Sequence, residues 1–207
     1  MAEVLEQMEQ APLVLHTAPG MRMDDDQFFQ FCQANRDLRI ERTAQGDLII
    51  MPPAGGSTSR GNAELTYLFQ DWARRDGTGQ VFDSSGGFKL PNGAMRSPDV
   101  SWVHGERLDV ISDEEWEKFL PLCPDFVLEL RSPSDSLRAV QKKMEEYIRN
   151  GARLGWLLDP ARKQVHLYRP RARPQVLENP ESVSGEPVLK RFVLDVRQVW
   201  AAMARRK

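Results

Sequence analysis

A charged residue inside an apolar segment is the first candidate for chemistry in this sequence. Glu129 lies in the stretch Asp125-Phe-Val-Leu-Glu-Leu-Arg131, whose composition predicts a strand. Alternation along a strand places Glu129 and Arg131 on the same face. A carboxylate is costly to bury unless it has a partner, a metal ion or a solvated cleft. Glu129 is therefore either a functional acid or one half of a structural salt bridge with Arg131.

A second carboxylate comes from one of two Pro-Asp pairs, Pro98-Asp99 and Pro124-Asp125. Asp125 lies on the same predicted strand as Glu129, about 13 Å away at roughly 3.3 Å per residue, which is too far to share a cation. Asp99 begins a different strand, and paired strands lie about 4.8 Å apart. Asp99 and Glu129 can thus reach one ion if their strands pair. Two carboxylates, completed by water and a phosphate oxygen, suit Mg²⁺ or Mn²⁺.

A lysine is available from the helix predicted over residues 134–150, directly after this strand. Its apolar positions form one stripe that must face the sheet, made of Leu137, Val140, Met144, Tyr147 and Ile148. Lys142 then points to water. Lys143 flanks the stripe, where its stem can follow apolar surface and its ammonium can reach the strand ends. Lys143 is the predicted catalytic lysine, and a solvated lysine on an exposed face is the alternative.

The elements that must position these residues are short strands and helices in alternation. Hairpins are predicted over 38–51 and 154–168, further strands over 80–82, 88–90 and 99–103, and helices over 60–75, 112–119 and 194–204. This order indicates an α/β (α+β) fold with a mixed sheet flanked by helices. Residues 1–20 lack periodicity and are expected to form a flexible leader, which leaves 21–207 as a single domain.

Composition and motifs exclude several functional classes. The 207 residues carry 28 Lys+Arg and 30 Asp+Glu, and a net charge of −2 excludes a generally basic nucleic-acid coat. A local basic run, Arg169 with Arg171 and Arg173, is either a DNA-backbone contact or a solvated loop. The Gly/Ser-rich segment 54–59, with Ser57 and Ser59 before Arg60, could hold a phosphate with its backbone amides. It lacks a Walker motif, and a linker with a helix cap is the expected role. The three histidines have no zinc spacing, and no GxSxG motif occurs.

The expected cellular setting follows from similar exclusions. Two cysteines without a CxxC motif favour a reduced compartment. The apolar run 11–15 is too short for a signal peptide or a membrane span. The sequence therefore predicts a cytoplasmic protein without membrane association.

Taken in order, several segments of the chain resemble the PD-(D/E)xK nuclease superfamily and, more narrowly, the Uma-type restriction endonuclease family of bacteria, which is common in cyanobacteria. The similar segments are Ile40-Glu41 through Ile49-Ile50-Met51-Pro52-Pro53, Ser97-Pro98-Asp99-Val100, Pro124 through Ser134, Lys143-Met-Glu-Glu-Tyr147, and Gly155-Trp-Leu-Leu-Asp159-Pro160. They span roughly residues 24–170. Their order and spacing together are more specific than any one of them.

This resemblance implies a restriction-endonuclease-like core and a metal-dependent endonuclease that hydrolyses DNA phosphodiester bonds with activated water. Asp99 and Glu129 then hold Mg²⁺ or Mn²⁺, and Lys143 orients the nucleophile or offsets negative charge. Glu41 is similar to the family's upstream acid, which lies near the metal. Arg131 stands where the superfamily usually has a lysine. Arginine is a poor proton acceptor but can clamp a phosphate, so it is expected to support catalysis while Lys143 supplies the ammonium.

Two alternatives follow from the arginine at position 131. One is a catalytically inactive, nuclease-fold protein that binds nucleic acid or a partner without cutting. The other is a purely structural domain in which Glu129 and Arg131 form a salt bridge. A homodimer is expected only from the mechanism, because cutting both strands of DNA generally requires two active sites.

Overall fold

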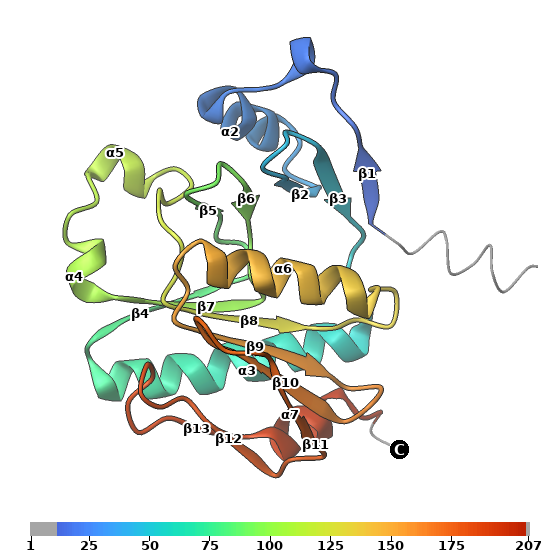
Figure 1. Cartoon of the computed structure of the whole chain (residues 1–207), viewed down its shortest axis with the longest axis vertical. Coiled ribbons are helices and arrows are strands. Elements are labelled where there is room, and N and C mark those ends of the chain that lie inside the picture. Colours follow the sequence, from blue (N-terminus) through green and yellow to red (C-terminus); the bar gives the residue numbers. More distant parts are fainter. Residues whose placement is uncertain (1–11, 206–207) are drawn as a thin grey trace, which may run out of the picture.

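A computed structural model describes residues 12–205 of the chain. The larger sheet has six strands in the order β11-β10-β9-β8-β7-β4 (Figure 1). Its strands are β4 (Gly79–Asp83), β7 (Val100–His104), β8 (Phe126–Leu130), β9 (Leu154–Asp159), β10 (Gln164–Tyr168) and β11 (Gln175–Glu178). Only β8 and β9 are parallel; the other neighbours are antiparallel. Parallel neighbours need a crossover connection, and α6 (Leu137–Arg149) provides it.

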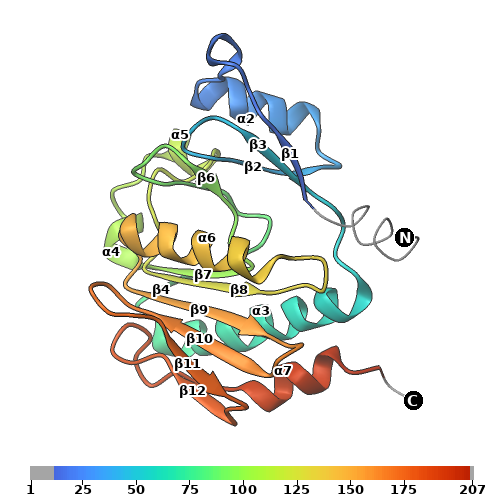
Figure 2. The same ribbon diagram turned by 45° about the vertical axis from the view of Figure 1, so that its right-hand side comes forward.

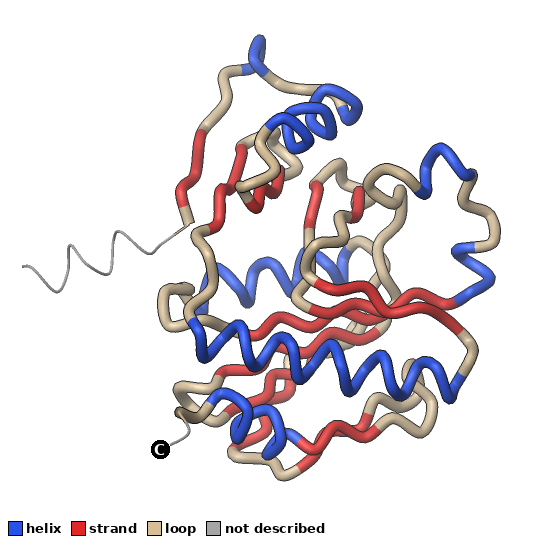
Figure 3. Tube along the Cα trace, turned by 180° about the vertical axis from the view of Figure 1, so that it is seen from behind, coloured by secondary structure: helices blue, strands red, loops and turns tan. Residues whose placement is uncertain are grey.

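Helices cover both faces of this sheet. Helix α6 lies on one face, and α3 (Gly56–Asp76) lies on the other beside α7 (Val196–Met203), as Figure 3 shows from behind. The strands between them are buried on both faces, which explains why β8 is apolar at every position except Glu129.

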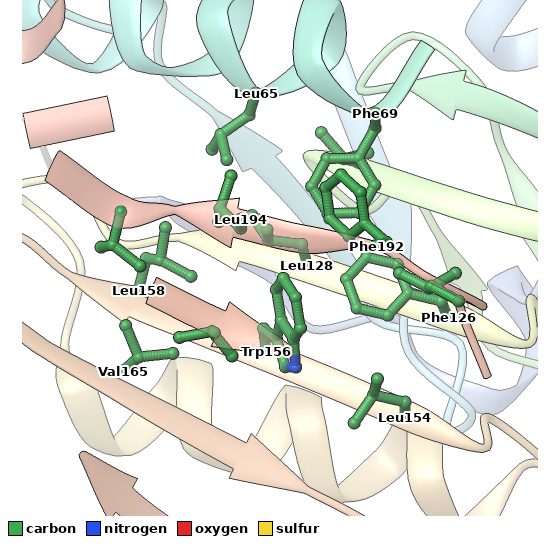
Figure 4. Packing of buried hydrophobic residues seen from close by; sticks show 14 of the residues in the cluster. Leu65, Phe69, Phe126, Leu128, Leu154, Trp156, Leu158, Val165, Phe192 and Leu194 are labelled. Carbon is green, nitrogen blue, oxygen red and sulfur yellow. The ribbon is translucent and has the colours of Figure 1, made fainter. Parts of the chain in front are cut away.

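Aromatic packing holds α3 against the sheet. The ring of Phe69 on α3 stacks on Phe126 of β8 with centroids 5.1 Å apart, and Phe192 packs 4.4 Å from Phe69 (Figure 4). Trp156 of β9 meets Phe126 edge to face at 5.0 Å. These contacts fix the position of β8, the strand that carries Glu129.

The smaller sheet lies on the α6 side of the larger one (Figures 1 and 2). Its five strands follow the order β1-β3-β2-β6-β5, with bounds β1 (Leu13–Leu15), β2 (Arg39–Arg42), β3 (Leu48–Met51), β5 (Phe88–Lys89) and β6 (Met95–Arg96). Helix α2 (Asp25–Ala34) covers its outer face, where Phe28 packs with Ile40. Because side chains alternate along β2, Arg39 and Glu41 point the other way, toward α6 and the larger sheet.

The remaining elements are short. They are the 3-10 turn η1 (Pro19–Met21), α4 (Gly105–Leu108), α5 (Asp113–Trp116) and the pair β12 (Ser182–Ser184) and β13 (Val193–Asp195). Within residues 12–205, none of the helices combines the length and apolarity that crossing a bilayer requires.

The mixed sheet with flanking helices confirms the predicted fold class, and both predicted hairpins form. Two expectations differ from the structure. The expected leader includes residues 13–15, which form β1 and pair with β3; its residues 1–11 lie outside the described part. The segment expected as a linker over 54–59 already contains the first turn of α3, which begins at Gly56.

Candidate active site

Asp99 and Glu129 face each other across the pair of strands β7 and β8. The antiparallel register joins Val100 to Leu128, and its continuation by one residue sets Asp99 opposite Glu129. The Oδ2 atom of Asp99 accepts a hydrogen bond of 2.8 Å from the backbone N–H of Leu130. This bond orients the carboxylate toward the same end of β8. The two carboxylates therefore meet through strand pairing, the condition for sharing an ion.

The lysine on α6 reaches this pair. Met144 and Tyr147 are buried against the sheet, and Lys143 lies beside them on the flank of the stripe. The Nζ atom of Lys143 lies 2.8 Å from Oε1 of Glu129 and 2.8 Å from Oε1 of Glu41. Only 16% of the Lys143 side chain is exposed, so this ammonium serves the site and not the solvent.

Glu41 enters the site from the smaller sheet, and both of its carboxylate oxygens have partners. Its Oε2 atom accepts a hydrogen bond of 3.0 Å from Arg96, and its Oε1 accepts one of 3.0 Å from the backbone N–H of Ser97. Arg96 also donates to Glu146 of α6 at 2.6 Å. This buried network ties β2 and β6 to α6, so it sets the distance between Glu41 and Lys143.

The two acids that share Lys143 have opposite pKa shifts. Burial raises the pKa of Glu129 to about 7, because the carboxylates of Asp99 and Glu41 add to desolvation and outweigh Lys143. Burial also disfavours ionised Glu41, but Lys143 and Arg96 overcome it and lower the pKa of Glu41 to about 2. The second cation accounts for the difference. Burial alone would lower the pKa of Lys143, but Glu129 and Glu41 raise it, so the lysine stays charged.

Tyr147 has a role that the apolar stripe alone does not predict. Its hydroxyl donates a hydrogen bond of 3.0 Å to Oε1 of Glu129, the same oxygen that binds Lys143. Burial and the negative charges of Glu129 and Glu41 raise the pKa of Tyr147 well above its usual value, which keeps it a donor. The signal was the spacing of Lys143 and Tyr147, since residues four apart lie on one helix face.

Arg39 and Asn62 contact Asp99, and sequence reasoning missed both. Two nitrogens of Arg39 lie 3.5 Å from Oδ1 of Asp99, and Nδ2 of Asn62 on α3 lies 3.4 Å from the same oxygen. The signal for Arg39 was its position two residues before Glu41 on a strand, which puts both on one face. No sequence signal pointed to Asn62.

The alternative of a salt bridge between Glu129 and Arg131 is wrong. Arg131 instead forms an ion pair with Asp159, at 3.0 Å from each carboxylate oxygen, and no Glu129–Arg131 salt bridge occurs in the described part of the chain. The backbone N–H of Arg131 still donates a hydrogen bond of 3.0 Å to the carbonyl of Leu158, so the pairing with β9 continues one residue past the end of β8 at Leu130. The parallel register of β8 and β9 joins Leu130 to Leu158, and its continuation brings Arg131 to Asp159.

The other polar candidates lie in structural contacts. Asp125 is buried, accepts the backbone N–H of His104 at 3.0 Å and binds Arg107 at 3.0 Å. Ser57 donates to the carbonyl of Met203 at 3.0 Å and thus ties α3 to α7. The basic run 169–173 follows β10 in an exposed turn, and DNA contact by this run stays a prediction.

The donor set fits Mg²⁺ or Mn²⁺ at Asp99 and Glu129. Hard carboxylate oxygens are the ligands that these ions prefer. Oδ1 of Asp99 receives only long contacts, and burial beside the carboxylates of Asp99 and Glu41 disfavours ionised Glu129, an effect that a divalent cation would offset. Among residues 12–205 no group of three or more His, Cys, Asp or Glu side chains could hold a metal ion. Water and phosphate would therefore complete the coordination.

The sequence matches the family model Uma2, described as "Putative restriction endonuclease", over residues 25–197. The chain belongs to the Uma2 family. This confirms the resemblance drawn from the motifs, and the match extends past residue 170 to include β11, β12, β13 and the start of α7.

The Uma2 assignment agrees with a likeness to a solved structure. The fold is similar to a crystal structure from Anabaena variabilis ATCC 29413, described as a putative nuclease belonging to DUF820, with a TM-score of 0.71 and 19% sequence identity. The likeness covers 88% of this chain and 99% of that one. Comparison with curated proteins gives no match. The structural likeness thus establishes a shared fold.

Proposed function

We propose that this Uma2 chain is a metal-dependent endonuclease that hydrolyses DNA phosphodiester bonds. The observation that carries the proposal is the meeting of Asp99 from the start of β7, Glu129 from β8 and Lys143 from α6 in one buried site. The nuclease descriptions of the family and of the similar crystal structure support the reaction class.

The carboxylates of Asp99 and Glu129 would hold Mg²⁺ or Mn²⁺. When bound, such an ion acts as a Lewis acid on the phosphoryl oxygen and lowers the pKa of its water ligand. Lys143 stays charged between Glu41 and Glu129, so it does not act as a base. Its part is to stabilise negative charge that develops on the phosphate as water attacks and the ester oxygen leaves.

The remaining residues keep this arrangement in place. Tyr147 fixes Oε1 of Glu129, and Glu41 holds the other side of the Lys143 ammonium. Arg96 binds Glu41 and Glu146 and so joins β2 to α6. The ammonium of Lys143 on α6 takes the place of the lysine that the superfamily usually has where this chain has Arg131. The engagement of Arg131 with Asp159 supports this division of roles.

Cleavage of supercoiled plasmid tests the proposal. The purified full chain is expected to nick plasmid with Mg²⁺ or Mn²⁺ and to be inactive in EDTA. Asp99→Asn and Glu129→Gln should each lower the rate by about 100-fold or more. Asp113→Asn, which removes an exposed carboxylate at the start of α5, is the matched control and should cut normally. Equal cutting by wild type and both site variants would overturn the assignment.

A second candidate is a nuclease-fold protein that binds nucleic acid without cutting it. One observation favours it: Lys143 and Arg39 already contact Glu129 and Asp99, so part of the negative charge is compensated without a metal. Retention of duplex DNA at several salt concentrations, with no metal-dependent cleavage, would support this candidate.

A homodimer is the proposed assembly for double-strand cutting, and light scattering at the concentrations used for cleavage tests it. A monomeric protein that cuts only one strand of duplex DNA would agree with the proposed active site and contradict the proposed dimer.

A further inference from the structure

The two oxygens of Asp99 have different surroundings. Oδ2 is occupied by the backbone N–H of Leu130 at 2.8 Å. Oδ1 is approached by Arg39 at 3.5 Å and by Asn62 at 3.4 Å. Charge-assisted hydrogen bonds usually measure about 2.7–2.9 Å, so these contacts are long. Oδ1 is thus the oxygen that remains available to a metal ion, because its hydrogen bonds from Arg39 and Asn62 are long and weak.

Arg39 is the most accessible cation of the site. Its side chain is 34% exposed, against 16% for Lys143 and 9% for Arg96. One guanidinium nitrogen is anchored by a hydrogen bond of 2.8 Å to the carbonyl of Ser97, while Nε is shielded from solvent and has no partner. The terminal nitrogens are thus the exposed part of the guanidinium, and their contacts with Asp99 are long, while the other two cations are enclosed by carboxylates.

We propose that Arg39 is a substrate-binding residue that rests on Oδ1 of Asp99 and turns to a phosphate of the nucleic-acid backbone when that oxygen takes a divalent cation. This inference rests on the proposed function. A guanidinium presents its donors in a planar fork that matches two phosphate oxygens. Asn62 loses the same acceptor, so its amide donor is released beside Arg39.

Replacement of Arg39 should therefore change the affinity for metal and the affinity for DNA in opposite directions. Arg39→Gln removes a cation that competes for Asp99, which should tighten Mn²⁺ binding about fivefold, the range of a partly exposed ion pair. The same change removes a charged phosphate contact, which should weaken duplex binding about tenfold. It should also lower the slope of log affinity against log salt by about 1. A residue that only supports the fold would weaken both kinds of binding.

The experiment uses the full chain in two assays. Calorimetry measures Mn²⁺ binding, and fluorescence anisotropy measures binding of a labelled duplex in Ca²⁺ over a range of salt concentrations. Arg39→Lys keeps the charge but loses the fork, so its affinities should fall between those of wild type and Arg39→Gln. Arg36→Gln removes an exposed arginine outside the site and is the matched control for net charge. Thermal unfolding establishes that every variant is folded.

Each outcome decides between defined alternatives. Tighter Mn²⁺ binding together with weaker duplex binding in Arg39→Gln supports the inference. Parallel weakening of both, or a duplex affinity equal to that of Arg36→Gln, overturns the role of Arg39 while wild-type binding leaves the proposed function intact. A wild-type chain that binds neither Mn²⁺ nor duplex overturns the proposed function and this inference together. If Arg39→Gln is unfolded, Arg39→Lys decides by the same criteria.

Discussion

The ammonium of Lys143 lies 2.8 Å from the carboxylate of Glu129, although one residue belongs to helix α6 and the other to strand β8. The same ammonium contacts Glu41 from the other sheet at an equal distance. One buried cation thus joins both sheets at the site. Glu129 keeps a raised pKa because burial, together with the carboxylates of Asp99 and Glu41, outweighs the effect of this ammonium.

Replacement of Lys143 should abolish most cleavage. Lys143→Met keeps an unbranched stem but removes the charge opposite the reacting phosphate, and the expected loss in single-turnover rate is about 100- to 1,000-fold. Lys142→Met, one residue away on the exposed face of α6, is the matched control and should keep the wild-type rate. Equal rates for the two variants would show that the ammonium has no catalytic part.

Removal of the Tyr147 hydroxyl should destabilise the protein. Tyr147→Phe leaves the ring in place but removes a buried hydrogen bond to an acid, at a cost of about 1.5–3 kcal/mol. For a chain of this length, at about 2–4 °C per kcal/mol, the Tm should fall by roughly 3–12 °C. Tyr67→Phe, on the exposed side of α3, should change the Tm little. An unchanged Tm for Tyr147→Phe would contradict a stabilising role for this bond.

The stability of the metal-free protein should depend on pH through Glu129. The pKa of Glu129 is about 7 in the folded state, against about 4.3 for an unperturbed glutamate. The folded state therefore binds this proton more tightly, so the stabilisation is complete below about pH 4.3 and is lost as pH rises through 7. The free energy of unfolding of wild type, minus that of Glu129→Gln, should fall between pH 5.5 and 8.

Urea unfolding in EDTA measures this difference. The lowered pKa of His166 works in the opposite direction, because a buried neutral histidine loses stability as pH falls. Its effect occurs in both proteins and cancels in the subtraction. A difference that stays constant over the pH range would mean that Glu129 is ionised throughout.

Arg131 should contribute to stability and not to catalysis. Arg131→Gln leaves Asp159, which is fully buried, with Arg162 as its remaining ion-pair partner, and the expected cost is about 2 kcal/mol or more. Cleavage by the folded variant should stay within about twofold of wild type. Chemical denaturation and plasmid cleavage well below the Tm measure the two effects separately. A large loss of cleavage rate in the fully folded Arg131→Gln variant would show that Arg131 takes part in catalysis.

Local patterns were sufficient for the parts of the site that follow from one element. An acid in an apolar strand singled out Glu129, because burial of a charge needs a reason. Helical periodicity separated Lys143 from Lys142, since the apolar stripe determines which flank meets the sheet. Asp99 was preferred to Asp125 because Asp99 begins a different strand from that of Glu129 and can approach Glu129 when the two strands pair.

The sequence by itself determined the elements, their buried faces and the acids that need a partner, because these depend on side-chain periods of two and 3.6 residues. Only the tertiary structure decided which partners they meet. Arg39 reaches Asp99 because the smaller sheet lies against the larger one, and Arg131 reaches Asp159 because β8 and β9 pair in register. Such contacts depend on the position of one element against another, and no local period along the chain encodes that position.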